Sequence, residues 1–138
     1  MGYLFVGLGG IVGALLRFLI GIIMVERWTH SFPLATLLIN LIGCFFLGWL
    51  TYYVFQLKVL PSHITVAIGT GFVGAFTTFS TFSVETVQLM TAAKWGVAFS
   101  YIFISLFGGL IFAGLGYRIG SFAFIKHQKS FEGKSGEK

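Results

Sequence analysis

Charge is what this sequence has least of. Only 9% of its 138 residues are Asp, Glu, Lys or Arg, whereas 57% are hydrophobic, and the mean hydropathy is +0.93. A soluble domain of this size needs a charged surface, which nine basic and four acidic residues cannot provide. Composition therefore excludes an ordinary soluble domain and makes the lipid bilayer the solvent for most side chains.

Catalytic groups are also scarce. Aspartate is absent, the histidines His30, His63 and His127 are scattered outside the apolar runs or at their edges, and there is no HExxH sequence or P-loop. Catalysis needs such groups together, so the sequence predicts no enzyme. Cys44 is the only cysteine, which excludes an intrachain disulfide and favours a small buried apolar role.

Four apolar runs account for most of the chain. The first carries one ionisable residue, Arg17, the third carries one, Glu85, and the other two carry none. Each run meets or exceeds the about 20 residues that cross a bilayer as a helix. Short connectors then predict an all-α antiparallel bundle, multi-pass in the cell membrane, with both termini on one side. The runs cover residues 3–25, 32–57, 64–93 and 95–117.

The character of the sequence changes near the C-terminus, where it reads KHQKSFEGKSGEK. We predict a transmembrane unit over residues 1–121 and a polar, basic tail over residues 122–138, expected to be a mobile extension. Four of the nine basic residues of the chain lie in this tail. On a membrane protein such a tail sets topology or contacts lipid headgroups, rather than binding nucleic acid.

Nineteen glycines lie mostly inside the apolar runs. Gly9 and Gly13 form a GxxxG pair in the first run, and Gly109 with Ala113 forms a small-xxx-small pair in the fourth. Small residues let membrane helices approach closely where no hydrophobic force drives them together. Most of these glycines are therefore expected to be packing residues.

The third run contains a stretch, residues 69–83, that packing alone does not explain. It holds three glycines and then five hydroxyl residues interleaved with phenylalanines. Glycine and threonine together form helix poorly, and the run is longer than one crossing needs. We favour a helix broken near the membrane centre, where irregular backbone lines a cavity or binds an ion. The alternative is a continuous helix whose hydroxyls bond to their own preceding turn.

Two features inside the runs suggest a path for an anion. Asn40, with Thr36 one turn earlier on the same face, either bonds a neighbouring helix or lines a pore and donates from its amide. Phe79 and Phe82 share a helical face. They either pack in lipid or protein, or present positive ring edges to an anion.

The ionisable residues inside the runs are functional candidates by default. Arg17 either attracts anions to a vestibule or reaches an interface. Glu85 would repel an anion if it were charged and exposed to the path, so a supporting hydrogen-bonded or protonated role is preferred. Tyr101 and Ser105, one turn apart, would extend a track of hydroxyls, although the pair alone is weak evidence.

Over residues 3–120 the chain resembles the Fluc (CrcB) family of fluoride channels. The resemblance is carried by GGIVGALLR at residues 9–17, NLIGCFFLG at 40–48 and, above all, GFVGAFTTFSTFSVE at 71–85. It implies a passive fluoride-selective channel that reduces fluoride toxicity, built as an antiparallel dimer with subunits of opposite orientation and two pathways. The broken third helix is implied to hold one central, non-transported Na⁺ through backbone carbonyls of both subunits.

The resemblance also assigns roles by motif position. The Na⁺ carbonyls fall on Gly74 and Thr77. Arg17 and Glu85 take vestibule or supporting roles, and the neighbouring hydroxyls Thr78 and Ser80 are expected to support the break. The implied fluoride pathway comprises Thr36, Asn40, Phe79, Phe82, Tyr101 and Ser105.

The residues agree with this mechanism. Fluoride is small and strongly hydrated, so a selective path must replace its water with donors such as the Asn40 amide, hydroxyl groups and ring edges. The larger chloride would fit a narrow aromatic constriction poorly. The alternative function is a small dimeric four-helix multidrug exporter, but such proteins centre on a carboxylate in the first helix, where this chain has Arg17.

Three departures complicate the resemblance. Ala75 stands where many members have glycine, and Gly109 and Ala113 stand where members commonly continue the hydroxyl track. The cations are also unequally divided: six lie on the side of the termini, whereas Arg27 and Lys94 lie on the other. This bias favours one insertion and hence a heterodimer with a related subunit, with a dual-topology homodimer as the alternative. The six are Lys58, Arg118, Lys126, Lys129, Lys134 and Lys138.

Overall fold

The computed structural model describes residues 2–28, 31–57 and 61–135, with side chains for all of these except 25–27, 53–57, 62 and 126–135. Every regular element in these ranges is helical. Three crossings are single helices: α1 (Gly2–Arg27), α2 (Leu34–Leu57) and α6 (Trp95–Ser135). The third is built from α3 (Ser62–Val66), η1 (Ala67–Val73), α4 (Gly74–Phe76) and α5 (Phe79–Thr91).

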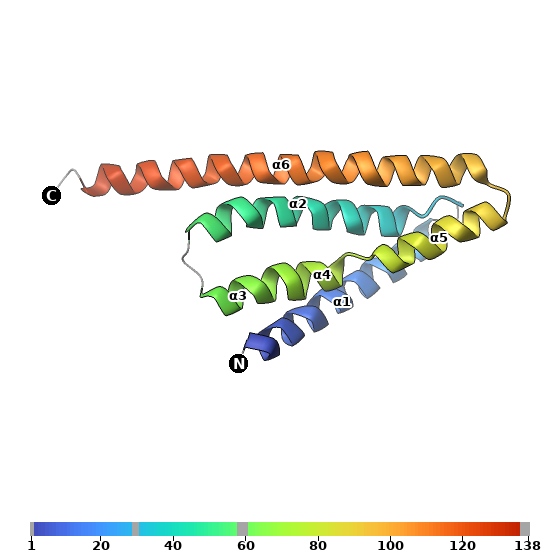
Figure 1. Cartoon of the computed structure of the whole chain (residues 1–138), viewed down its shortest axis with the longest axis horizontal. Helices are drawn as coiled ribbons and strands as arrows, with labels where there is room; N and C mark the ends of the chain where they lie inside the picture. The colour runs from blue at the N-terminus through green and yellow to red at the C-terminus, as the bar shows by residue number, and fades with distance from the viewer. Residues whose placement is uncertain (1, 29–30, 58–60, 136–138) are drawn as a thin grey trace.

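Four spans of the described chain are long and apolar enough to cross a membrane, which confirms the predicted all-α membrane protein. The crossings run antiparallel, and both chain ends lie toward the same end of the molecule (Figure 1). α6 lies along α2, and α1 packs against the first half of the third crossing (Figure 1). Short connections make consecutive crossings antiparallel, but the most extensive packing is between crossings that are not consecutive in the chain.

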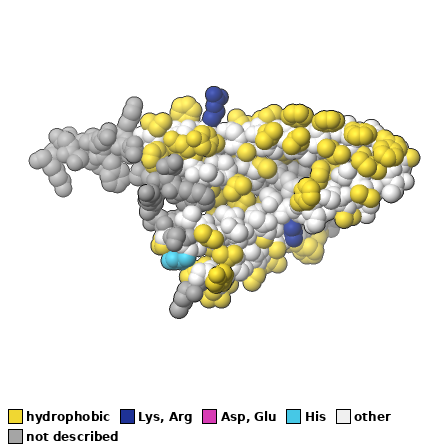
Figure 2. Space-filling model, in the orientation of Figure 1, with side chains coloured by type: hydrophobic (Ala, Val, Ile, Leu, Met, Phe, Trp, Pro, Cys, Tyr) yellow, Lys and Arg dark blue, Asp and Glu magenta, His cyan; other side chains and the backbone are white. Residues whose placement is uncertain are grey.

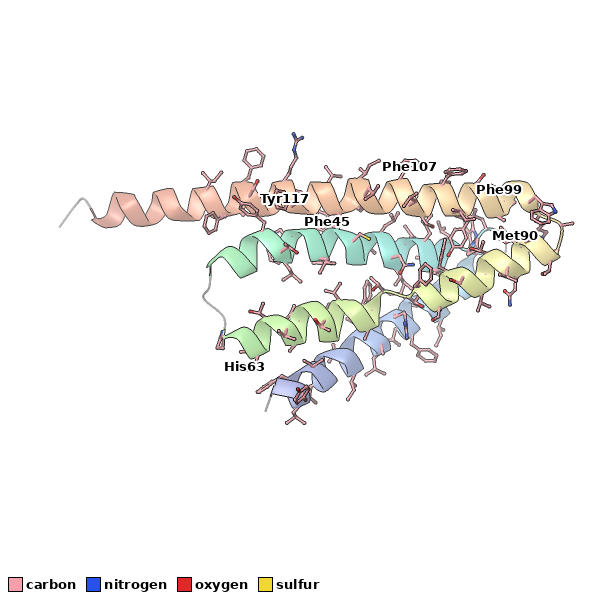
Figure 3. The ribbon with its side chains drawn as sticks, viewed as in Figure 1. Phe45, His63, Met90, Phe99, Phe107 and Tyr117 are labelled. Carbon is pink, nitrogen blue, oxygen red and sulfur yellow. The ribbon has the colours of Figure 1, made fainter. Side chains whose placement is uncertain are left out.

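Lipid-facing side chains dominate the outside. Hydrophobic side chains are spread over the described face, where the coloured charged or titratable side chains are a few isolated Lys, Arg or His (Figure 2). Phe107, on the outer side of α6, is 56% exposed (Figure 3). Such exposure would be a liability in water, but it is expected when hydrocarbon is the solvent.

The best-buried cluster lies where α2, α5 and α6 meet. Leu37 and Leu41 from α2 pack there against Leu89 from α5, and Ala98 and Tyr101 from α6 are fully buried. This cluster fixes the end of the bundle nearest the α5–α6 turn.

Glycines fix two close helix crossings. A Cβ added at Gly9 would lie 2.5 Å from the carbonyl oxygen of Ala67, so α1 and η1 meet backbone to backbone. The crossing of α2 and α6 relies in the same way on Gly48 and Gly116. The packing role expected for the glycines therefore holds at these positions.

The turn between α5 and α6 is tight and strained. The Lys94 N–H donates to the Leu89 carbonyl at 2.9 Å and the Ala93 N–H to the Met90 carbonyl at 3.0 Å, as in a Schellman cap. Ala93 has a φ of 57°, a left-handed conformation that normally favours glycine. The turn thus places Lys94 at the very start of α6.

α6 continues past the boundary expected near residue 121. It is 41 residues long, or about 60 Å at 1.5 Å per residue, roughly twice a hydrocarbon core. Its apolar part ends at Ile125, so the remaining helical backbone extends beyond the length needed for a crossing. The backbone up to Ser135 is thus helical. The division into two regions and the mobility of the tail stay predictions.

Candidate ion pathway

The third crossing is interrupted at two residues. Thr77 (φ −77°, ψ 159°) and Thr78 (φ −147°, ψ 119°) are extended, between α4 and α5. η1, a seven-residue π-helix, precedes the interruption. Wide π turns are often found at functional sites. The prediction of a broken helix is confirmed, and the continuous alternative is wrong.

Asn40 from α2 holds the interruption open. Its Nδ2 donates to the Thr78 carbonyl oxygen at 3.0 Å, and its Oδ1 accepts from the Thr78 N–H at 2.8 Å. In a continuous helix that N–H would donate to the carbonyl oxygen of Gly74. The amide therefore substitutes for the missing helical turn, and the Gly74 carbonyl loses its regular donor.

The second carbonyl at the interruption is released by a cap. The Thr81 N–H, which would bond Thr77 O in a continuous helix, donates to Thr78 Oγ1 at 3.2 Å, and this caps α5. Thr78 is buried, and its hydroxyl lies 3.3 Å from that of Ser80. Arg17 Nη1 donates to Thr77 O at the long distance of 3.4 Å. The guanidinium thus lies at the break.

Gly43 was not singled out from the sequence as a separate site residue. A Cβ at this position would collide with Thr77 Cγ2, so only glycine lets α2 approach the interruption here. Gly43 follows Asn40 by three residues and lies on the same helical face. Its place inside NLIGCFFLG was the one available signal.

Glu85 collects two hydroxyl groups from two other helices. Its Oε1 accepts from Thr36 Oγ1 at 2.8 Å, and its Oε2 accepts from Tyr101 OH at 2.8 Å. Thr36 and Tyr101 are both buried. The structure thus unites three residues that the sequence placed in different runs. Both hydroxyls donate hydrogen bonds to the Glu85 carboxylate, so neither is left as a free donor along an ion path.

The two phenylalanines share a face but differ in exposure. The rings of Phe79 and Phe82 lie 5.8 Å apart between centroids. Phe79 is 80% exposed within the single chain, whereas Phe82 packs on Tyr101 at 5.0 Å. One ring therefore belongs to the core next to Glu85, and the other is presented outward beside the break.

Comparison with known proteins places this geometry in a family. The model of the family described as "CrcB-like protein, Camphor Resistance (CrcB)" matches residues 4–117. The chain belongs to the CrcB family. Membership excludes an enzyme and gives no support to the alternative of a multidrug exporter; the chain is a multi-pass membrane protein.

Relatives in the CrcB family carry consistent names. The chain is 58% identical over 125 residues to "Fluoride-specific ion channel FluC 1" of Bacillus cereus, covering 91% of each protein. It is 51% identical over 107 residues to a protein of that name from Desulfitobacterium hafniense, covering 78% of this chain and 92% of the relative. It is also 45% identical over 117 residues to "Fluoride-specific ion channel FluC 2" of Geobacillus kaustophilus, covering 85% and 91%.

Beyond Ser105, positions 109 and 113 carry no hydroxyl side chain. Ser105 Oγ is buried and finds no hydrogen-bond partner among the described residues. One turn on, a Cβ at Gly109 would lie 3.5 Å from Cys44 Sγ, in ordinary contact. The carbonyl of Ala113 lies against Gly48 at the crossing of α2 and α6. A small residue at position 113 thus lies at a packing contact.

A metal at this site would need backbone ligands. No group of three His, Cys, Asp or Glu side chains able to hold a metal occurs in the described part of the chain. The carbonyl oxygens of Gly74 and Thr77 fit a hard cation such as Na⁺, because unwound helical carbonyls are typical Na⁺ ligands. Two carbonyls are too few for a complete shell, so one chain supplies only part of the site.

Proposed function

We propose that this chain is one subunit of a fluoride-selective channel that conducts F⁻ passively across the cell membrane and limits fluoride toxicity. The observation that carries the proposal is the interruption at Thr77 and Thr78, held by Asn40 beside the exposed ring of Phe79. The names of the relatives, fluoride-specific ion channels at 45–58% identity, support the choice of ion.

The polar groups at the site suit a strongly hydrated anion. Asn40 Nδ2 has two hydrogens, of which the Thr78 carbonyl accepts one, so the other is available to an anion. The edges of Phe79 and Phe82 carry partial positive charge and add contacts that bring no water. An anion moving past Tyr101 would compete with Glu85 for the same hydroxyl proton. The carboxylate would therefore limit how readily this donor binds the anion.

We further propose that Na⁺ binds at Gly74 O and Thr77 O and is not transported. The ion would neutralise the carbonyl dipoles that the interruption leaves without helical donors. Arg17 already donates weakly to Thr77 O, so the guanidinium and Na⁺ would share one oxygen or the side chain would withdraw toward the vestibule. A partner subunit would complete the shell with its own pair of carbonyls.

The partner is proposed to be a second subunit in the opposite orientation. The 80% exposure of Phe79 beside a polar interruption supports a protein cover rather than lipid. The cation bias favours a related subunit over a second copy, and the relatives named FluC 1 and FluC 2 fit paired subunits. Of the cations counted, Lys58 and Lys138 lie outside the described residues, and the side chains of Arg27, Lys126, Lys129 and Lys134 are not described.

A flux experiment tests the function. The purified chain is reconstituted in liposomes loaded with fluoride, and efflux is followed with a fluoride electrode, with chloride as the matched anion. Fast fluoride efflux without chloride efflux is expected from the assembled dimer, so the chain is reconstituted both alone and together with a related subunit. Phe79→Ile and Phe82→Ile keep volume and hydrophobicity but remove the ring quadrupole, so each should reduce efflux strongly without preventing assembly. Normal efflux from the double variant would defeat the aromatic part of the proposal.

A topology experiment separates the two partner hypotheses. Reporters active only inside or only outside the cell are fused to the C-terminus. A signal from the inside reporter alone, with no fluoride conductance from the chain purified by itself, is expected for an obligate pair. Equal signals, or conductance from the purified chain alone, would contradict the pair and leave the channel standing.

A further inference from the structure

An open hollow of about 320 Å³ lies at the α5–α6 turn, away from the helix interruption. Its polar lining comes from Ser31 before α2, Gln88 and Glu85 on α5, and Lys94 at the start of α6. Ser31, Gln88 and Lys94 are exposed, whereas Glu85 is half-buried. The hollow therefore runs from solvent toward a residue of the buried hydroxyl network.

Glu85 joins the hollow to the interior. The same carboxylate that lines the hollow accepts the hydroxyls of Thr36 and Tyr101. Tyr101 in turn packs on Phe82. Glu85 thus contacts the hollow on one side and the buried hydroxyl donors on the other.

Lys94 is held at the rim by the chain itself. Its backbone N–H closes the Schellman cap, and its ammonium donates to Ser31 Oγ at 2.5 Å. That partner is a neutral hydroxyl rather than a carboxylate, so the bond leaves the positive charge uncompensated. Both oxygens of Glu85 are meanwhile engaged by hydroxyl donors, which disperses the negative charge on the other side of the hollow.

We propose that this hollow is an aqueous mouth of the fluoride path, and that Lys94 concentrates fluoride there. The inference rests on the proposed channel function and adds a site remote from the interruption. Lys94 acts through its field and not as a ligand in the conducting path. Its effect should therefore depend on charge and ionic strength, and not on the shape of the side chain.

The expected magnitude follows from Coulomb's law. In water, a unit positive charge at a separation of about 8 Å raises the local concentration of a monovalent anion about two-fold. At about 0.01 M ionic strength the Debye length is about 30 Å and the effect is intact, whereas at about 1 M it is about 3 Å and the effect is screened out. Lys94→Gln should lower fluoride efflux about two-fold at low ionic strength, and Lys94→Glu about four-fold.

Two control variants distinguish an electrostatic effect of Lys94 from an effect on the folded structure. Ser31→Ala removes the hydrogen bond to Lys94 and keeps its charge, so any change in efflux should be the same at both ionic strengths. Arg118→Gln removes one positive charge from an exposed position on α6 that does not line the hollow, and it should change efflux at neither. All efflux measurements use an impermeant salt to set the ionic strength.

A chemical variant tests the charge within one protein. Lys94→Cys is treated with a methanethiosulfonate that carries either an ammonium or a sulfonate group, with treated wild type as the control for Cys44. The ammonium should restore efflux toward wild type and the sulfonate should lower it. The proposed mouth would be wrong if the Lys94 variants lowered efflux equally at both ionic strengths. It would also be wrong if the two reagents had the same effect on Lys94→Cys. Absence of fluoride efflux at every ionic strength from the wild-type chain, both alone and paired with a related subunit, would instead overturn the channel itself, and the mouth with it.

Discussion

Replacing Gly9 by alanine tests whether backbone contact between α1 and η1 holds the first half of the third crossing. The added Cβ would lie 2.5 Å from the carbonyl oxygen of Ala67, whereas ordinary contact begins at 3.4 Å. The two helices would have to separate by the difference, about 0.9 Å, because the Cβ is fixed to the α1 backbone and the oxygen belongs to the η1 backbone. Neither can move by changing a rotamer.

The energetic consequence is a loss of packing. A gap of about 0.5–1 Å forfeits a quarter to a half of the dispersion energy at a contact. Overpacking of this kind typically costs about 1–3 kcal/mol. Packing is the main attraction between helices in lipid, so no hydrophobic gain offsets the loss. We expect Gly9→Ala to lower the free energy of unfolding by about 1–3 kcal/mol.

Two other glycines of α1 are matched controls. A Cβ at Gly10 would make only ordinary contacts, at 3.8 and 3.9 Å, and a Cβ at Gly7 would meet nothing within 4 Å of the chain. Alanine there should be neutral or stabilising by up to about 1 kcal/mol through helix propensity. Reversible unfolding in mixed micelles, at equal protein concentration, measures all three. An equal loss in Gly10→Ala, or none in Gly9→Ala, would refute the backbone-contact argument.

Three further predictions concern the interruption, the hydroxyl network and the turn. Asn40→Asp places an acceptor oxygen against the Thr78 carbonyl, and since an unsatisfied buried polar group costs about 1–3 kcal/mol, efflux should fall about ten-fold with assembly unchanged; wild-type efflux would contradict the clamp. Tyr101→Phe keeps the ring but removes one donor to Glu85, so it should lower the free energy of unfolding by about 1.5–3 kcal/mol and also lower efflux. If neither quantity fell, the hydrogen bond would contribute to neither stability nor conduction. Ala93→Gly relieves a left-handed alanine and should stabilise by about 1 kcal/mol, seen as a higher melting temperature in detergent, whereas a lower one would argue against the Schellman turn.

The sequence was sufficient wherever composition and local propensity decide the outcome. Long apolar runs must become helices in lipid, because every backbone polar group there needs an internal partner. The glycine and threonine content of residues 69–83 likewise predicted the broken third crossing. Propensity could not place the break at Thr77 and Thr78, because that position depends on Asn40, 38 residues away in sequence.

The polar tail shows where reading by composition was insufficient. The sequence predicted a mobile extension over residues 122–138 and did not foresee that α6 continues to Ser135. Phe122 and Ile125 continue the apolar pattern of the fourth run, and a helix already formed is extended at low cost because nucleation has been completed. A change from apolar to polar sequence thus marked the end of the membrane span and not the end of the helix.

By itself, then, the sequence determined a four-span helical membrane protein with a weak third helix, because hydrophobic length and helix propensity act locally. Only the tertiary structure decided the partners of its polar groups. Thr36, Glu85 and Tyr101 come from three helices, and their union depends on how α2, α5 and α6 pack. Spacing along a chain fixes which residues share a helix face, but the contacts between faces arise only when glycine-lined crossings set the distances between helices.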